Sequence, residues 1–356
     1  MPSHTIDSVI ASIARVTTHT DRESLESSLM TNLFELLELK QVTLYKIINE
    51  YGEQRCLLCA DVVNENIKLH DPCNLKSQFP TEQITGLTQC LAIGEALFLN
   101  QNEQPLDTYI HPLTNRGGEI TNVFKITGLE LNTPINKSLL TGYFNIYHNY
   151  FRILDDSEHD TLTGLLNRRT FERNLDQILS KWQHPNDSQL KSDNIHPLRR
   201  HPSKKEGCWL AEIDIDFFKR INDQYGHLYG DEVLLLLASI MRNSFRSYDK
   251  LFRFGGEEFV VILRSTDRKG AEMALERFRS MVNGYDFPQI GQVTVSIGYV
   301  EVTNQGIPAA VLGSADEALY YAKEHGRNRV CYYQDLVEQG ALRPTKEIVS
   351  TEIELF

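Results

Sequence analysis

The chain has 356 residues, of which 41% are hydrophobic and 24% charged, so we expect a globular protein of two domains of ~100–200 residues each. Its net charge of −12 argues against general nucleic-acid binding, because an acidic surface repels phosphate backbones. Residues 1–30 lack a signal-peptide pattern and no stretch approaches the ~20 apolar residues that span a bilayer, which predicts a cytoplasmic protein without a membrane partner.

The cysteines do not form the pattern of a disulfide-stapled domain, because they are scattered over a long chain. Cys56 and Cys59 have CxxC spacing, but they lie in a β-rich run, where residues three apart point to opposite faces. We therefore expect partly buried strand cysteines here, with a metal or redox role as the alternative.

Residues 1–145 are expected to form an α+β domain. Helical spacing gives way to a hairpin, an irregular connection and further strands. This order and length resemble the GAF family of cytoplasmic sensor domains. The resemblance implies regulation by a ligand that the sequence leaves open: a small molecule, a haem, a bilin, a metal or a partner protein. The predicted elements are helices over 5–16 and 21–37 and strands over 41–48, 55–63, 96–99, 119–126 and 142–147.

Residues 146–159 are expected to join the two domains as a linker helix. Tyr147, Tyr150, Phe151 and Leu154 recur at helical spacing. In a dimer this apolar stripe would pair with its twin as a short coiled coil.

Residues 160–334 alternate strands and helices, which predicts one sheet with helices packed on it. Residues 183–206 lack periodicity and are expected to form a mobile surface loop; metal binding by its histidines, at 184, 196 and 201, is the alternative. Residues 335–356 are acidic and are expected to form a tail. The predicted elements are strands over 209–216, 292–300 and 329–333, a hairpin over 251–263, and helices over 232–245, 271–282 and 314–324.

An acidic turn lies in the predicted hairpin. Two glycines precede Glu257 and Glu258 there, between apolar β segments. Taken alone, this is either a solvated turn or a turn that holds a cation. Asp214 and Asp216 lie on one face of an otherwise apolar strand, and buried carboxylates require partners. If that strand neighbours the hairpin, Asp214, Glu257 and Glu258 converge as hard oxygen ligands suited to Mg²⁺.

Side chains able to recognise guanine follow that strand. Asn222 and Asp231 offer the acceptors that guanine's N1–H and amino group need, whereas adenine presents the opposite pattern. Lys219 can reach phosphate oxygens. His227 is either a helix-packing residue or a ligand contact.

Two basic residues end the last predicted helix. Lys323 and Arg327 are four apart, so they project the same way if the helix reaches that far. They are either charges favoured by the helix dipole or a phosphate clamp.

These residues together resemble the GGDEF family, the diguanylate cyclases, over about residues 160–333. The resemblance implies a central sheet flanked by helices and the condensation of two GTP into cyclic di-GMP and two pyrophosphates. The matching blocks are Asp160-x-Leu-Thr-Gly-Leu-x-Asn-Arg-Arg, Asp214-Ile-Asp-x-Phe-Lys-x-Ile-Asn-Asp, Gly226-His-x-x-Gly-Asp231, Arg253-x-Gly-Gly-Glu-Glu-Phe and Ala315-Asp-x-Ala-Leu-Tyr-x-Ala-Lys-x-x-Gly-Arg-Asn.

The resemblance also implies a role for each matching residue. Glu257 would help deprotonate the 3′-hydroxyl, and Lys219 would stabilise charge on the phosphoryl group. The metal ligands, for Mg²⁺ with Mn²⁺ as a substitute, would be Asp214, the carbonyl of Ile215, Glu257 and Glu258. The substrate-binding residues would be Asn222, His227, Asp231, Lys323 and Arg327.

A block upstream of the turn resembles the family's inhibitory site. Arg246-Ser-Tyr-Asp249 matches its RxxD pattern, and Arg277 is placed like its second arginine. Cyclic di-GMP bound there would slow turnover. An exposed salt bridge between Arg246 and Asp249 is the alternative interpretation.

The resemblance implies a homodimer, because each domain holds one GTP and the product joins two. The rival function is a non-catalytic receptor that binds GTP or cyclic di-GMP and signals through contacts. Such receptors usually lose one of the acidic residues, and Asp214, Glu257 and Glu258 are all present.

Overall fold

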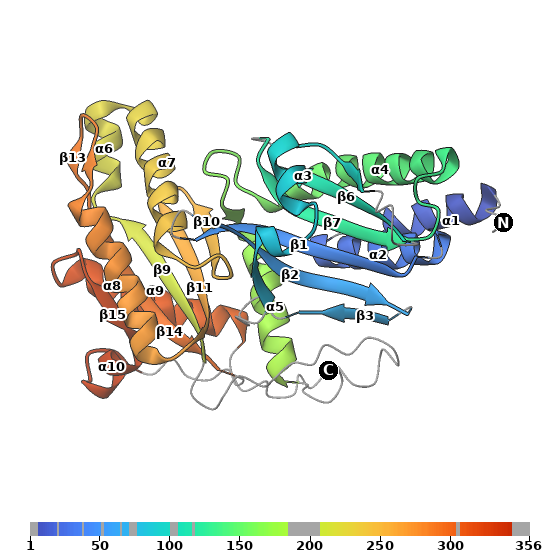
Figure 1. Ribbon diagram of the computed structural model, residues 1–356. Helices are drawn as coiled ribbons and strands as arrows, with labels where there is room; N and C mark the ends of the chain where they lie inside the picture. The colour runs from blue at the N-terminus through green and yellow to red at the C-terminus, as the bar shows by residue number, and fades with distance from the viewer. Residues whose placement is uncertain are drawn as a thin grey trace, which may run out of the picture. The chain divides into compact units, whose positions relative to one another are not determined.

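The structure is a computed structural model of the chain. It describes residues 6–19, 21–37, 39–50, 53–64, 66–70, 77–99, 106–115, 118–183, 207–303 and 307–343 (Figure 1). They fall into two compact units, one ending at Ser157 and the other beginning at Glu158. None of the helices in these ranges combines the length and the apolar character needed to cross a bilayer.

The first unit is built on an antiparallel sheet in the order β3-β2-β1-β7-β6-β5, with β4 paired to β2. Leucines of α2 and aromatic residues of α4 contribute to the larger hydrophobic core of this unit. Its strands are β1 (Gln41–Glu50), β2 (Glu53–Val63), β3 (Asn66–Leu69), β4 (Gln78–Pro80), β5 (Leu97–Leu99), β6 (Asp107–Thr114) and β7 (Ile120–Gly128). Its helices are α1 (Ile6–Val16), α2 (Arg22–Leu37), the 3₁₀ turn η2 (Thr81–Gln83), α3 (Leu87–Ile93) and α4 (Pro134–Glu158), whose last residue opens the second unit.

The strand predicted over 142–147 is wrong, because these residues lie inside α4. Tyr143, Phe144 and Tyr147 are β-favouring aromatics, but their spacing also fits one helical face. All three are buried in the core of the first unit. The aromatic composition favours a strand, but tertiary packing makes this segment helical.

The stripe predicted to pair with a second copy is also wrong. Tyr147, Phe151 and Leu154 are buried in the core of the first unit, and Tyr150 packs against that core. Tyr150 also donates a hydrogen bond to the carbonyl of His19, at 2.7 Å. The inner face of α4 is therefore already occupied.

The two cysteines with CxxC spacing point to opposite faces of β2, as predicted. Cys56 is buried in a cluster with Cys90, whereas Cys59 packs against the larger core. Burial raises the pKa of both Cys56 and Cys59 to about 11. These are the surroundings of structural thiols, since a reactive cysteine needs a lowered pKa.

A half-buried histidine is expected to make the first unit sensitive to acid. His111 stacks on Phe144 with ring centroids 3.9 Å apart, and its Nδ1 lies 2.9 Å from the Tyr109 hydroxyl. Burial, assisted by His148, lowers the pKa of His111 to about 4. The unfolded chain binds this proton near pH 6.5, so stability is complete above that pH and falls as the pH drops toward 4.

We expect a loss of up to about 3 kcal/mol over this range, at roughly 1.4 kcal/mol per pKa unit. The His111→Gln variant should lose most of that dependence, because glutamine does not titrate. Amide hydrogen exchange of β6 and β7, measured on the full chain between pH 7.5 and 4.5, reports the first unit alone. The prediction would be contradicted if the stability of the first unit depended on pH equally in the variant and in the original protein.

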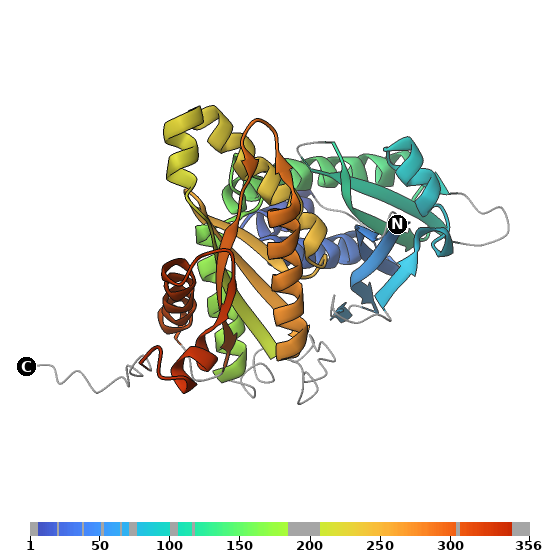
Figure 2. The same cartoon turned by 90° about the vertical axis from the view of Figure 1, so that its left-hand side faces the viewer.

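The second unit is built on a mixed sheet in the order β15-β14-β9-β11-β10-β8, in which β9 is central (Figure 2). Its strands are β8 (Leu166–Asn167), β9 (Gly207–Ile215), β10 (Lys250–Gly255), β11 (Glu258–Thr266), β14 (Val295–Val302), β15 (Val330–Tyr332) and the separate pair β12 (Asp286–Phe287) and β13 (Gly291–Gln292). Its helices are α5 (Arg168–Gln183), α6 (Phe218–Tyr225), α7 (His227–Ser244), α8 (Arg268–Gly284), α9 (Pro308–Glu324) and α10 (Tyr333–Glu338).

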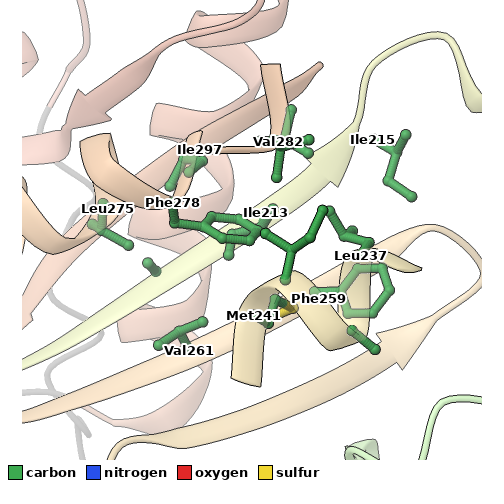
Figure 3. Close-up of a cluster of buried hydrophobic side chains, with 14 of the residues drawn as sticks. Ile213, Ile215, Leu237, Met241, Phe259, Val261, Leu275, Phe278, Val282 and Ile297 are labelled. Atoms are coloured by element: carbon green, nitrogen blue, oxygen red, sulfur yellow. The ribbon is translucent and has the colours of Figure 1, made fainter. Parts of the chain in front are cut away.

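Helices cover both faces of this sheet, and the alternation along β9 shows which side each residue faces. Ile213 and Ile215 pack with α7 and α8 in the main core, beside Phe259 and Phe278 (Figure 3). Leu210 packs in the cluster formed with α5 and α9. The even-numbered residues of β9 therefore face α9, which places the acidic ones on that side.

Helix α9 lies directly against β14. A Cβ built on Gly298 would lie 2.2 Å from the carbonyl oxygen of Ala315 and 2.2 Å from the amide nitrogen of Leu319. Only glycine permits this approach, so the backbones of α9 and β14 are in contact. This fixes the depth of α9 above the sheet.

The predicted start of the tail at residue 335 is wrong, because α10 continues to Glu338. Tyr333 and Leu336 are buried against α9, and Asp335 forms an ion pair with Arg268. The helix is one and a half turns long, too short for periodicity to reveal it. Residues 344–356 lie outside the described ranges, as does the loop predicted over 183–206 beyond Gln183.

Candidate active site

The acidic strand and the acidic turn are neighbours, as the sequence predicts. Antiparallel pairing of β9 with β11 sets Asp214 directly opposite Glu258, and both belong to the face covered by α9. Glu257 lies in the turn just before Glu258. Asp214 is only 4% exposed, so its charge cannot rely on water.

Lys323 supplies the positive charge for this face. Its Nζ reaches from α9 to Asp214 Oδ2 at 2.8 Å. Burial raises the pKa of Asp214 and Lys323 opposes that rise. Burial also raises the pKa of Glu257, and the charge of Asp214 adds to the effect. Among the described residues, the carboxylates of this face therefore hold more negative charge than Lys323 alone can neutralise.

Glu212 is a fourth carboxylate of this face that the sequence analysis missed. It is 5% exposed, and its Oε2 is buried without a hydrogen-bond partner among the described residues. Burial, followed by repulsion from Asp316 and Glu258, raises the pKa of Glu212 to about 8. The signal was available in the sequence, because residues 212, 214 and 216 alternate along one strand.

The glycine turn is braced by a half-buried arginine. Arg253 Nη1 lies 3.0 and 3.2 Å from the two carboxylate oxygens of Asp160, and Arg253 Nη2 donates to the carbonyl of Gly256 at 2.8 Å. Burial acts to raise the pKa of Asp160, but hydrogen bonds from Thr163 and Arg253 outweigh it and lower the pKa. Gly256 has φ 48°, whereas Gly255 still belongs to β10. The brace thus sets the position from which Glu257 projects.

Asp216 has a different partner set from Asp214. It is 5% exposed and accepts hydrogen bonds from Thr294 Oγ1 at 2.6 Å, Ser296 Oγ at 2.7 Å and the Asn328 amide at 3.0 Å. It therefore anchors the segment that carries Arg327. The sequence predicts that Asp216 needs partners but does not reveal which ones.

The predicted guanine-reading residues meet where α6 and α7 pack together. Asn222 is half-buried on α6, and Asp231 is exposed on α7 next to Gly230. A Cβ on Gly230 would lie 2.0 Å from Asn222 Oδ1. Gly230 thereby leaves room for the Asn222 carboxamide. Lys219 and His227 are both exposed nearby in the chain, so packing does not account for His227.

The Gly230→Ala variant is expected to displace the Asn222 side chain and raise the KM for GTP, the substrate that the sequence resemblance implies, by about tenfold, the value of one lost hydrogen bond. Thermal stability should change little, because the clashing atom ends a side chain that can rotate. Steady-state kinetics and thermal unfolding measure the two effects. Gly313→Ala in α9, where a Cβ meets nothing within 4 Å, is the matched control. An unchanged KM would show that Asn222 does not need this space.

The sequence of the second unit is similar to that of known proteins. Residues 185–329 match the protein family described as diguanylate cyclase, GGDEF domain. The chain carries a GGDEF domain. It is 38% identical over 174 residues to diguanylate cyclase DgcP of Pseudomonas aeruginosa, covering 48% of this chain and 23% of that protein. It is 36% identical over 206 residues to the response regulator PleD of Caulobacter vibrioides, covering 56% and 41%. It is 42% identical over 147 residues to diguanylate cyclase A of Treponema denticola, covering 40% and 39%.

The donor set of the GGDEF domain fits a hard divalent cation. Asp214 and Glu258 present carboxylate oxygens, and Ile215, whose side chain is buried in the core, has only its backbone carbonyl to offer. The described residues contain no preformed group of three or more acidic, histidine or cysteine ligands. Lys323 is the cation that contacts Asp214, so an ion bound there would have to share or replace that contact.

The RxxD block of the GGDEF domain forms a closed turn. The Asp249 carboxylate accepts hydrogen bonds from the backbone amides of Arg246, at 3.0 Å, and Arg264, at 3.3 Å. The Arg246 side chain is exposed and donates to the Tyr248 hydroxyl, and Arg277 donates to the carbonyl of Ser244. The side chains of Arg246 and Asp249 therefore bind other partners, and not each other as the alternative interpretation expects. The inhibitory role of these residues stays a prediction.

Proposed function

We propose that this protein is a diguanylate cyclase that condenses two GTP into cyclic di-GMP and two pyrophosphates. The chain spans less than half the length of the relatives described above, so their activity is transferred to it as a proposal. The observation that carries it is the buried acidic face of β9 beside the braced turn, with Asp214, Glu257 and Glu258 all present.

Each group has a task that suits its place. A bound Mg²⁺, or Mn²⁺ in its stead, would screen the charge of the triphosphate and polarise the α-phosphate. Glu257 accepts the proton of the 3′-hydroxyl, and its raised pKa makes it a better base than a solvated carboxylate. Lys219 and Lys323 balance the phosphate charge, while Asn222 and Asp231 recognise the guanine edge.

We propose that the active species is a homodimer, since each domain supplies one of the two nucleotides. The outer face of α4 supports this, because Ile135 and Ile153 are 69% and 62% exposed. Residues on that face repeat at spacings of four and three, the pattern of a coiled-coil seam, with one asparagine that could set the register. They are Ile135, Leu139, Gly142, Ile146, Asn149 and Ile153, of which Leu139 also packs against the core of the first unit.

Two regulatory roles complete the proposal. Cyclic di-GMP bound at Arg246, Asp249 and Arg277 would inhibit turnover. The first unit, as a GAF-like sensor for an unidentified ligand, would set the rate through α4. Initial rates with and without added product, and the absorption spectrum of the purified protein, test the two roles separately.

The central test is incubation of the purified full chain with GTP and Mg²⁺. Cyclic di-GMP should accumulate, and the rate per chain should rise with protein concentration as dimers form. A dimeric preparation that binds GTP without forming product would instead favour the rival function, a nucleotide receptor.

A further inference from the structure

Phe217 is held in an unusual state at the end of β9. It lies directly after Asp216 and is 46% exposed, although it is a large aromatic residue. Its φ of 58° lies in the left-handed region, which bulky residues rarely adopt. Arg327 and Asn328, in the loop after α9, also have positive φ, at 61° and 46°. Such conformations persist where the surroundings hold them, and they cluster at functional sites.

Two arginines meet on the Phe217 ring. The guanidinium carbon of Arg220, from α6, lies 4.5 Å from the ring centroid. That of Arg327, from the loop after α9, lies 4.4 Å from the same centroid. Asp216 holds the two segments together, because its carboxylate accepts the amide of Asn328. Residues more than a hundred positions apart are thus gathered on one aromatic ring.

Among the described residues, no carboxylate pairs with the positive charge gathered there. The ring attracts each cation, but two like charges so close repel one another. Arginine presents a planar fork that matches phosphate oxygens in pairs. The arrangement therefore suits an anion with several phosphate oxygens.

We propose that Phe217 is a positioning residue that holds Arg220 and Arg327 as a clamp for the polyphosphate of a nucleoside triphosphate. The inference rests on the proposed function, because it places this clamp at the active site of a GTP-using enzyme. It adds Arg220 as a phosphate-binding residue and gives Arg327 a physical support. Phe217 itself touches the arginines, and it acts on the nucleotide through them.

The test compares the affinities of GTP and GMP in the full-length protein with Mg²⁺ present, together with KM and kcat for GTP. Arg220→Gln and Phe217→Leu should each weaken GTP binding by about tenfold, the loss of one charge-assisted contact. Binding of GMP, which lacks the polyphosphate, should change less than about twofold. Phe217→Tyr retains the aromatic face and should bind GTP like the original protein.

Lys269→Gln is the matched control for charge. This substitution removes one exposed positive charge at the start of α8. Helix α8 follows Thr266, which is the last residue of β11, whereas Glu258 is the first. Thermal unfolding of every variant shows whether Phe217→Leu remains folded. If that variant does not fold, Arg220→Gln and Arg220→Lys decide the matter, since lysine keeps the charge but loses the fork.

The outcomes separate the inference from the proposed function. Unchanged GTP affinity in both Arg220→Gln and Phe217→Leu would overturn the clamp, as would an equal loss for GTP and GMP. A protein that forms no cyclic di-GMP, yet loses GTP affinity selectively in these variants, would support the clamp and refute the cyclase.

Discussion

Replacement of Glu257 by glutamine is expected to lower the rate of cyclic di-GMP formation by roughly 10²–10⁴-fold, the range for loss of a general base. The free energy of unfolding should stay unchanged or rise. Burial and the charge of Asp214 already disfavour an ionised group at this position, so a neutral amide of the same shape relieves repulsion. The variant thus separates catalysis from stability.

Product formation is measured by chromatography, and unfolding by tryptophan fluorescence in urea. Both tryptophans, Trp182 and Trp209, belong to the second unit, so their signal reports this unit. Glu272→Gln, an exposed acidic residue of α8, is the control and should retain full activity. Residual activity near that of the original protein would contradict the role of Glu257, and a parallel loss of stability would make the residue structural.

Replacement of Asp216 by asparagine should lower the free energy of unfolding of the second unit by about 3 kcal/mol. Two hydroxyls and one backbone amide donate to this buried carboxylate. An asparagine loses the charge that strengthens all three hydrogen bonds. If its oxygen stays opposite Thr294 and Asn328, its amide nitrogen faces Ser296, whose hydroxyl must turn from donor to acceptor. The KM for GTP should rise as well, because Asn328 and its neighbour Arg327 lose their anchor.

Asp223→Asn provides the comparison, since Asp223 is an exposed carboxylate on the adjoining helix α6. Its effect on stability should stay within about 0.5 kcal/mol. Urea unfolding followed by tryptophan fluorescence measures both variants. If Asp216→Asn behaved like Asp223→Asn, the three hydrogen bonds would carry little of the stability of the loop.

The acidic site is predictable from the sequence because its logic is local. Alternation places Asp214 on one strand face, and flanking apolar residues place Glu257 in a hairpin turn. What the sequence cannot supply is the identity of partners that come from distant segments. The pairing of Lys323 with Asp214 depends on how far α9 reaches, and the anchoring of Asn328 by Asp216 depends on a contact across 112 positions.

The errors in the fold have a common physical origin. The aromatic run that begins at Tyr143 favours a strand by composition. It forms a helix instead, because in that conformation its aromatic side chains are buried in the core of the first unit. The short helix α10 forms because Tyr333 and Leu336 are buried against α9. In both cases packing from elsewhere in the chain decided between local alternatives.

The contact between Gly298 and α9 links a buried strand to the nucleotide site. Any side chain at this position must lift α9 from the sheet, and Lys323 would move with the helix. The change would occur in the middle of a buried strand, yet its main symptom would be poor use of nucleotide. A genetic screen would therefore score Gly298 among the substrate contacts, although the residue has no side chain with which to make one.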